Sequence, residues 1–281
     1  MLSSQTLSTL ASRILLQNIS PALNKPVTLH RRIVGNSDAP ILIIMHGLLG
    51  SADNWLTLAK RYSEKFQVHL VDARNHGRSP KSESHSYPAM AEDLLGYLNE
   101  HEIEKTALIG HSMGGKTAMT FAEKHPERIT KLIIADIAPR AYLPHHGHIF
   151  EALKMTSPEN ATSREEVLES LKLSLGSDSV LIQFLMKSLR REKSGGFSWR
   201  FNVDVLSNAI HRITEKIDLT INTLPTLFIY GRKSEYVTQN DLSEVEELYL
   251  QIETACLENS GHWLHAQEPE LFFEITSEFL S

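Results

Sequence analysis

The sequence predicts an α/β protein with a mostly parallel, doubly wound sheet and one inserted helical segment. Short apolar runs alternate with longer amphipathic stretches, which is typical of βαβ units. One of these runs leads directly into a Gly-x-Ser-x-Gly motif at residues 110–114. The alternation stops between about residues 139 and 218, where helical patterns replace it. Together these observations predict a sheet whose strand ends are covered by an insertion.

The apolar runs predict the strands, and the amphipathic stretches between them predict the helices. The expected strands are 27–34, 41–46, 68–72, 107–111, 132–136, 226–230 and 253–257. The expected helices are 54–65, 89–101, 113–124, 242–250 and 269–279. A doubly wound sheet places its functional groups at the carboxyl ends of its strands.

The insertion contains helical patterns at 149–155, 164–173 and 180–190, then a turn at 193–196 and a possible extended segment at 197–203. We expect it to be a cap that shapes a substrate pocket, although helices that do not contact any ligand are an alternative. The predicted division is therefore an N-terminal extension of uncertain role (1–25), a core (26–138 and 219–281) and a helical cap (139–218).

The composition excludes several classes of function. The chain has 281 residues, a net charge of −6 and scattered positive charges, so nucleic acid is not an expected partner. One cysteine cannot form an internal disulfide, which favours a reducing compartment such as the cytoplasm. No apolar stretch is long enough to span a bilayer. The basic N-terminal residues leave the mitochondrial matrix as an alternative, if residues 1–25 act as a targeting segment. The sequence does not predict the oligomeric state.

Ser112 lies between the expected strand 107–111 and the expected helix 113–124, within Gly110-His111-Ser112-Met113-Gly114. A serine in this context occupies a strained turn, the nucleophile elbow, that exposes its hydroxyl above the sheet. A turn in which the serine merely caps the helix is the alternative. We expect Ser112 to be a nucleophile.

A serine hydroxyl needs a base to take its proton. In this topology the base is a histidine in a late loop, and His262 follows the last expected strand within Asn259-Ser260-Gly261-His262-Trp263. His265 lies close by and is a weaker candidate, because it has no adjacent glycine.

Two acidic residues could orient the imidazole, and the residues alone do not separate them. The usual position is three residues after Gly231, where this chain has Ser234, with Glu235 next to it. Asp136, after the apolar run 132–135, also lies between Ser112 and His262 in chain order. An aspartate at the end of a buried strand is costly unless it is hydrogen-bonded.

The negative oxygen that forms during attack needs donors, and we expect them to be the backbone N–H groups of Met113 and Leu48. Leu48 belongs to the loop His46-Gly47-Leu48-Leu49-Gly50 after a strand. We expect His46 and His111 to contact the substrate. The loop 72–79 is expected to be structural. His145, His146 and His148 have too few acidic neighbours for a metal site, so a pocket rim or plain surface is favoured.

These motifs, together with Asp136-Ile137-Ala138-Pro139 and Trp199-Arg200-Phe201-Asn202, resemble the α/β-hydrolase superfamily. Within it, residues 26–281 are similar to the group around the bacterial esterase YbfF and its mitochondrial relatives, the α/β-hydrolase-domain-containing eleven proteins. The resemblance implies that the acid is the residue at Asp136, and this favours Asp136 over Glu235. It also implies a serine carboxylesterase acting on small or medium acyl esters under a helical cap.

We therefore expect a small-molecule acyl ester as substrate, an acyl-enzyme intermediate, and neither a metal nor an organic cofactor. Two alternatives are a thioesterase or acyltransferase using the same triad, and a catalytically silent hydrolase fold that acts as a binding protein.

Overall fold

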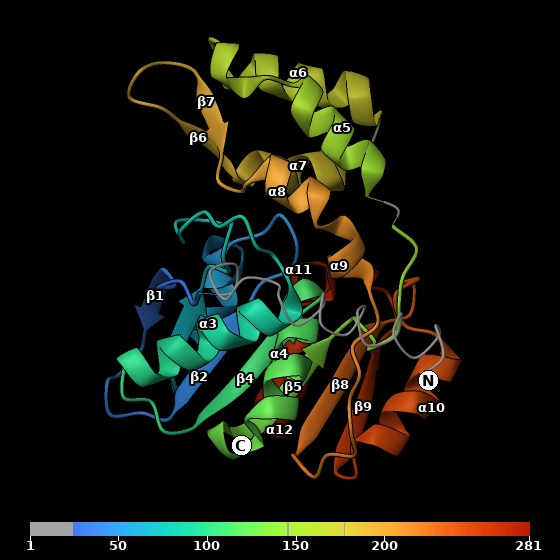
Figure 1. Cartoon of the computed structure of the whole chain (residues 1–281). Coiled ribbons are helices and arrows are strands. Elements are labelled where there is room, and N and C mark those ends of the chain that lie inside the picture. Colours follow the sequence, from blue (N-terminus) through green and yellow to red (C-terminus); the bar gives the residue numbers. More distant parts are fainter. Residues whose placement is uncertain (1–24, 145, 177) are drawn as a thin grey trace, which may run out of the picture.

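The computed structural model describes residues 25–144, 146–176 and 178–281. Its centre is a seven-stranded sheet of order β1-β3-β2-β4-β5-β8-β9 (Figure 1). Strand β1 pairs antiparallel with β3, and the other neighbours in the sheet pair in parallel. The strands are β1 (Arg31–Val34), β2 (Ile41–Met45), β3 (Gln67–Val71), β4 (Thr106–His111), β5 (Ile129–Ala135), β8 (Thr226–Gly231) and β9 (Ile252–Leu257). The predicted fold class is confirmed.

Helices cover both faces of this sheet. One face packs against α2 (Leu56–Tyr62) and α12 (Pro269–Leu280), and the other against α3 (Tyr87–Glu100), α4 (Met113–Lys124) and α10 (Gln239–Leu248). Successive residues of β2 alternate between the two cores: Leu42 and Ile44 join the first, Ile43 and Met45 the second. Each fully buried aliphatic side chain contributes about 1.5–3 kcal/mol to the free energy of unfolding. Short helices η2 (Ala52–Trp55), η3 (Pro126–Arg128) and α11 (Leu264–Gln267) complete the layers.

Two predicted boundaries are wrong because side chains take over backbone hydrogen bonds. The predicted strand 27–34 shortens to β1, since the N–H of Val27 donates to Asp93 and the N–H of His30 donates to Ser79. Helix α10 begins three residues before the predicted start, because Thr238 caps it with a capping box.

The insertion between β5 and β8 is mainly helical and lies at the carboxyl ends of the strands (Figure 1). Its elements are α5 (Gly147–Met155), η4 (Pro158–Asn160), α6 (Arg164–Leu175), α7 (Ser179–Lys187), β6 (Leu189–Arg191), β7 (Phe197–Trp199), α8 (Val203–Asn208) and α9 (Ile210–Thr214). The predicted helix 180–190 is wrong at its end, where β6 pairs with β7 across a glycine-containing turn. These elements share an apolar cluster with Leu49 of the loop after β2.

The two connections that join the insertion to the sheet run side by side. The N–H of Tyr142 donates to the carbonyl of Thr214 at 2.8 Å, and the N–H of Ile217 donates to the carbonyl of Pro139 at 2.9 Å. We call residues 139–142 and 213–217 the neck. Because the neck pairs with itself, the insertion is attached to the sheet by two hydrogen-bonded segments.

Lys116 of α4 holds both segments of the neck. Its ammonium group donates to the carbonyls of Arg140, at 2.7 Å, and Glu215. Its side chain is completely buried, and burial lowers its pKa to about 7, with the nearby Arg140 charge also lowering it and Glu215 opposing the shift. Its own N–H donates to the carbonyl of Ser112 at 3.0 Å, so one residue links the elbow to the neck.

Lys116→Met is expected to leave two neck carbonyls without their donor, which costs roughly 1–3 kcal/mol each.

The stability of the wild-type chain should in addition depend on pH through Lys116. Its unfolded state binds a proton on Lys116 more tightly than the folded state, so stability rises with pH above the folded pKa of about 7. The methionine variant lacks this rise. Urea unfolding at pH 7, 8 and 9 measures this effect. The difference in the free energy of unfolding between the wild type and Lys116→Met should widen with pH, by at most ~1.4 kcal/mol per pH unit. A gap that stays constant would contradict this account.

The predicted extension at residues 1–25 lies, up to residue 24, outside the described residues. Among the residues that the structure describes, no helix combines the length and the apolar character needed to cross a membrane.

Candidate active site

Ser112 lies at the turn between β4 and α4, with φ 53° and ψ −118°. Residues other than glycine rarely adopt this backbone conformation. Two glycines permit this turn. A Cβ on Gly110 would lie 2.4 Å from the carbonyl oxygen of Gly114, and a Cβ on Gly114 would lie 2.4 Å from the carbonyl oxygen of Met45. The predicted elbow is therefore sterically specified by its sequence.

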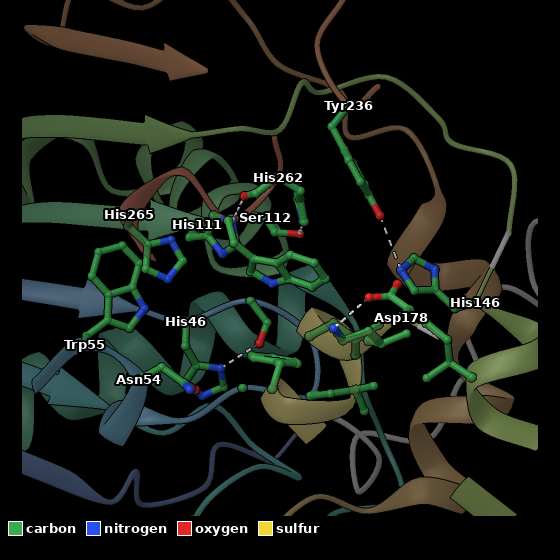
Figure 2. Close-up of a pocket in the computed structure, with 18 of the residues that line it drawn as sticks. His46, Asn54, Trp55, His111, Ser112, His146, Asp178, Tyr236, His262 and His265 are labelled. Atoms are coloured by element: carbon green, nitrogen blue, oxygen red, sulfur yellow. Dashed lines mark hydrogen bonds between the residues drawn. The ribbon is translucent and has the colours of Figure 1, made fainter. Parts of the chain in front are cut away.

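His262 reaches Ser112 from the loop after β9, as the chain order predicts. Its Nε2 lies 3.0 Å from the Oγ of Ser112 (Figure 2). Its Nδ1 lies 2.7 Å from the Oδ2 of Asp136. Asp136 directly follows β5 and has φ 52°. Asp136 lies 24 positions after Ser112 and 126 positions before His262 in the sequence. The three side chains nevertheless form one hydrogen-bonded series.

The carboxylate of Asp136 is fully buried and well supplied with donors. Its Oδ1 accepts the N–H of Gly231 at 3.0 Å, and its Oδ2 accepts the hydroxyl of Ser234 as well as the imidazole. Several donors offset the cost of burying a carboxylate. Glu235, the alternative from the sequence, is exposed, while its backbone carbonyl accepts from Arg140. The imidazole is thus paired with Asp136.

Tyr236 completes the surroundings of His262, and the sequence analysis missed it. Its ring stacks on the imidazole with centroids 3.9 Å apart and planes inclined by 18°. Its hydroxyl lies 3.4 Å from the Nε2 of His146 in the insertion (Figure 2). Burial raises the pKa of Tyr236 to about 12, so the hydroxyl keeps its proton at neutral pH. No motif marks this residue, although its place two positions after Ser234 puts it in the right loop.

The other histidines near Ser112 are held in place by their neighbours. The Nε2–H of His111 donates to the carbonyl of His262 at 2.8 Å, which fixes the loop that carries the imidazole. Burial, and to a lesser degree the neighbouring His262, lowers the pKa of His111 to about 3. His265 stacks on Trp55 with centroids 4.1 Å apart, and burial lowers its pKa well below the usual range. His265 is therefore not positioned as the base.

His46 has backbone partners at both ring nitrogens. Its Nδ1–H donates to the carbonyl of Gly47 at 2.8 Å, and its Nε2 accepts the N–H of Ala73 at 3.0 Å. Burial lowers its pKa, which favours this neutral form. Both His46 and His111 line the pocket described below, but their hydrogen bonds lead us to propose that they position the loops around the substrate.

The loop after β2 approaches the elbow closely. A Cβ on Gly47 would lie 2.9 Å from the Nδ1 of His111 and 3.3 Å from the Cβ of Ser112. Leu48 and Met113, whose N–H groups are the predicted donors, line one small cavity together with Ser112. Met113 opens helix α4, where backbone N–H groups have no carbonyl partner within the helix.

The loop 72–79 has the structural bonds that the sequence predicts. Asp72 accepts the N–H groups of Ala52, at 2.7 Å, and Arg78, at 2.9 Å. Arg74 forms a two-point ion pair with Asp93, at 2.6 and 2.7 Å, and both side chains are buried. These contacts join the loop to α3 and to the loop after β2.

A cavity of about 260 Å³ opens beside Ser112 and His262. The sheet side contributes His46, His111, Trp55 and His265 to its wall (Figure 2). The insertion contributes His146, His148, Ile149, Asp178, Leu181 and Phe184. The insertion thus forms one wall of the pocket, and His146 and His148 lie at this wall as the pocket-rim interpretation predicts.

The family described as alpha/beta hydrolase fold matches residues 40–269, which is most of the chain. This chain belongs to the α/β-hydrolase fold family. The resemblance predicted from the motifs is confirmed.

This α/β hydrolase is 36% identical over 255 residues to the sn-1-specific diacylglycerol lipase ABHD11 of Mus musculus, with 88% of this chain and 83% of that protein covered. It is 35% identical over 247 residues to Esterase YbfF of Escherichia coli (strain K12), with 88% and 94% covered. A solved structure titled "Marine microorganism esterase" superposes with a TM-score of 0.86 at 39% identity, covering 90% of this chain and 99% of that one. These relatives carry esterase or lipase names, which support a hydrolase.

Proposed function

We propose that this protein is a serine carboxylesterase that hydrolyses small or medium acyl esters through an acyl-enzyme intermediate. One observation carries the proposal: Ser112, His262 and Asp136 form a continuous hydrogen-bonded series, and Ser112 and His262 line a cavity. This arrangement is the one that activates a serine hydroxyl at neutral pH.

In the first step, the Oγ of Ser112 attacks the ester carbonyl while the Nε2 of His262 takes its proton. Asp136 holds the Nδ1 proton of the imidazole and stabilises the imidazolium that forms. The N–H groups of Leu48 and Met113 stabilise the negative oxygen of the tetrahedral intermediate. The bond to the alcohol oxygen then breaks, and His262 gives that oxygen the proton.

In the second step, water adds to the acyl carbon with His262 again acting as the base. The bond to the Oγ of Ser112 breaks, the serine regains its proton, and the acid leaves. Every proton passes through the imidazole, so these steps need no metal or organic cofactor.

Fluorophosphonate labelling tests this proposal. We expect a folded wild-type chain to gain one phosphonyl group, with intact-mass and peptide analysis locating it on Ser112, because an activated serine reacts with such probes. The control is Ser112→Ala, which removes the hydroxyl and should therefore gain no phosphonyl group. Absence of labelling at Ser112 would favour the catalytically silent fold.

The same side chains could cleave thioesters or transfer the acyl group to an alcohol, because both use an identical acyl-enzyme. Product analysis with added alcohol separates hydrolysis from transfer. A predominant new ester would contradict hydrolysis as the main reaction.

We further propose that residues 139–218 act as a cap and that the protein works in a reducing compartment, the cytoplasm or the mitochondrial matrix. The insertion wall of the pocket supports the cap, and the single cysteine supports the compartment. Fractionation of cells that express the tagged full-length chain tests the compartment, and recovery with secreted proteins would contradict it.

A further inference from the structure

Two cavities of unequal size meet at Ser112. The larger has a volume of about 260 Å³, and the smaller a volume of about 20 Å³. Their walls share Ser112, Leu48, His146 and Tyr236. An ester bound at Ser112 has an acyl arm, on the carbonyl carbon, and an alcohol arm, on the ester oxygen. Each cavity can receive one of them.

The position of His262 decides which arm enters which cavity. His262 lines the larger cavity. Among the described residues, Met113 and Ile137 line the smaller cavity and His262 does not. The imidazole must give its proton to the leaving alcohol oxygen, so that oxygen lies beside His262. The acyl arm points away from the imidazole, toward the smaller cavity.

We propose that the smaller cavity is the acyl site and the larger cavity the alcohol site, so that the substrates are esters of acetic acid with a bulkier alcohol. This inference rests on the proposed function and names its substrate class. The reaction joins the acyl carbon to the Oγ of Ser112 and breaks its bond to the alcohol oxygen. That oxygen receives the serine proton through His262, and water later releases the short acid.

The sizes support this assignment. A volume of about 20 Å³ holds a group the size of one water molecule, which is also the size of a methyl group. A cavity of roughly 150 Å³ is known to accommodate benzene, so the larger cavity has space for an aryl or branched alkyl group. Trp55, Phe184 and Trp263 give it apolar walls suited to such an alcohol.

Hydrogen bonds hold the walls of the smaller cavity in place. The hydroxyl of Tyr87 donates to the carbonyl of Ile213 at 2.6 Å. The hydroxyl of Tyr142 donates to the carbonyl of Tyr236 at 2.8 Å, and its N–H donates to Thr214 at 2.8 Å. Both segments of the neck therefore contribute hydrogen-bonded residues to the wall of this cavity, which limits the room for a longer acyl chain.

The test crosses two substrate series on the full-length chain. One series varies the acid, from p-nitrophenyl acetate to octanoate, and the other varies the alcohol among acetate esters of primary alkyl alcohols with similar leaving-group reactivity, from ethyl to cyclohexylmethyl. We expect kcat/KM to fall by about 10-fold or more between acetate and hexanoate, the scale on which a pocket rejects extra methylenes. Along the alcohol series kcat/KM should hold or rise.

Three variants connect each preference to its cavity. Ile213→Ala enlarges the smaller cavity and should raise the hexanoate-to-acetate ratio about 10-fold or more, whereas Ile213→Phe should lower it. Leu181→Ala enlarges the larger cavity and should change the alcohol series alone. The matched control is Ile182→Ala, which removes the same number of atoms from a buried isoleucine that lines an outer groove of the insertion.

A wild-type preference for long acids with small alcohols would overturn the assignment, as would an acyl profile that neither Ile213 variant alters. Both outcomes still include ester hydrolysis, so they leave the proposed function intact. A folded chain that hydrolyses no member of either series would instead contradict the proposed function.

Discussion

Ser112→Ala is expected to lower kcat/KM for ester hydrolysis by about 10⁴-fold to 10⁶-fold. The remaining rate is the one that substrate binding and oxyanion stabilisation support without a nucleophile. The physical reason is that the hydroxyl forms the covalent bond to the acyl carbon, and in the described part of the chain no other hydroxyl occupies its place 3.0 Å from the Nε2 of His262. Initial rates with p-nitrophenyl acetate measure the effect.

The stability of two variants separates lost chemistry from lost structure. Ser112 adopts φ 53°, and such strain costs roughly 1–3 kcal/mol for a residue with a Cβ. Ser112→Ala keeps the Cβ and should unfold near the wild-type temperature. Ser112→Gly should unfold at a higher temperature, because glycine adopts this backbone freely. Both should be inactive. Substantial hydrolysis by the alanine variant would remove Ser112 from the proposed mechanism.

The sheet could be predicted from sequence because its signals are local. Each buried strand is a short apolar run, and the elbow glycines stand where any Cβ would lie 2.4 Å from a backbone oxygen. The error at β1 arises because side chains from distant segments intervene. Asp93 and Ser79 take the N–H groups that would extend β1, and no feature of residues 27–30 reports those partners.

The site was predictable in part for the same reason. Chain order and loop position indicate Ser112 and His262, but the choice of acid depends on a contact between residues 126 positions apart. The stacking of Tyr236 on His262 depends on how the loop after β8 bends, which no local pattern encodes.

The histidines show a further limit of sequence reasoning. Residue type and position predict that His46 and His111 contact the substrate, and both do line the cavity. Their ring nitrogens, however, bond to the backbone of Gly47, Ala73 and His262. Buried polar groups need such partners, so a histidine next to a reactive group is as well suited to fixing a loop as to binding a ligand.

Asp136→Asn is expected to lower kcat by about 10⁴-fold while leaving KM nearly unchanged. The asparagine amide cannot stabilise the imidazolium, and it no longer holds the proton on the Nδ1 of His262, 2.7 Å away. Asparagine is the right replacement because, like aspartate, it tolerates the positive φ of 52° at this position. Steady-state kinetics with p-nitrophenyl acetate measure both constants.

Glu235→Gln is the matched comparison, since it makes the same carboxylate-to-amide change one residue after Ser234. The Glu235 side chain is exposed, so water solvates its charge and the substitution should alter kcat less than about 2-fold. Ser234→Ala should fall between the two, because it removes one donor from the Asp136 carboxylate but leaves the charge. The order of the three effects follows from how directly each side chain acts on the imidazole: Asp136 pairs with it, Ser234 bonds to Asp136, and the Glu235 side chain is exposed. A crippled Glu235→Gln beside a nearly normal Asp136→Asn would mean that the working enzyme pairs His262 with a different acid.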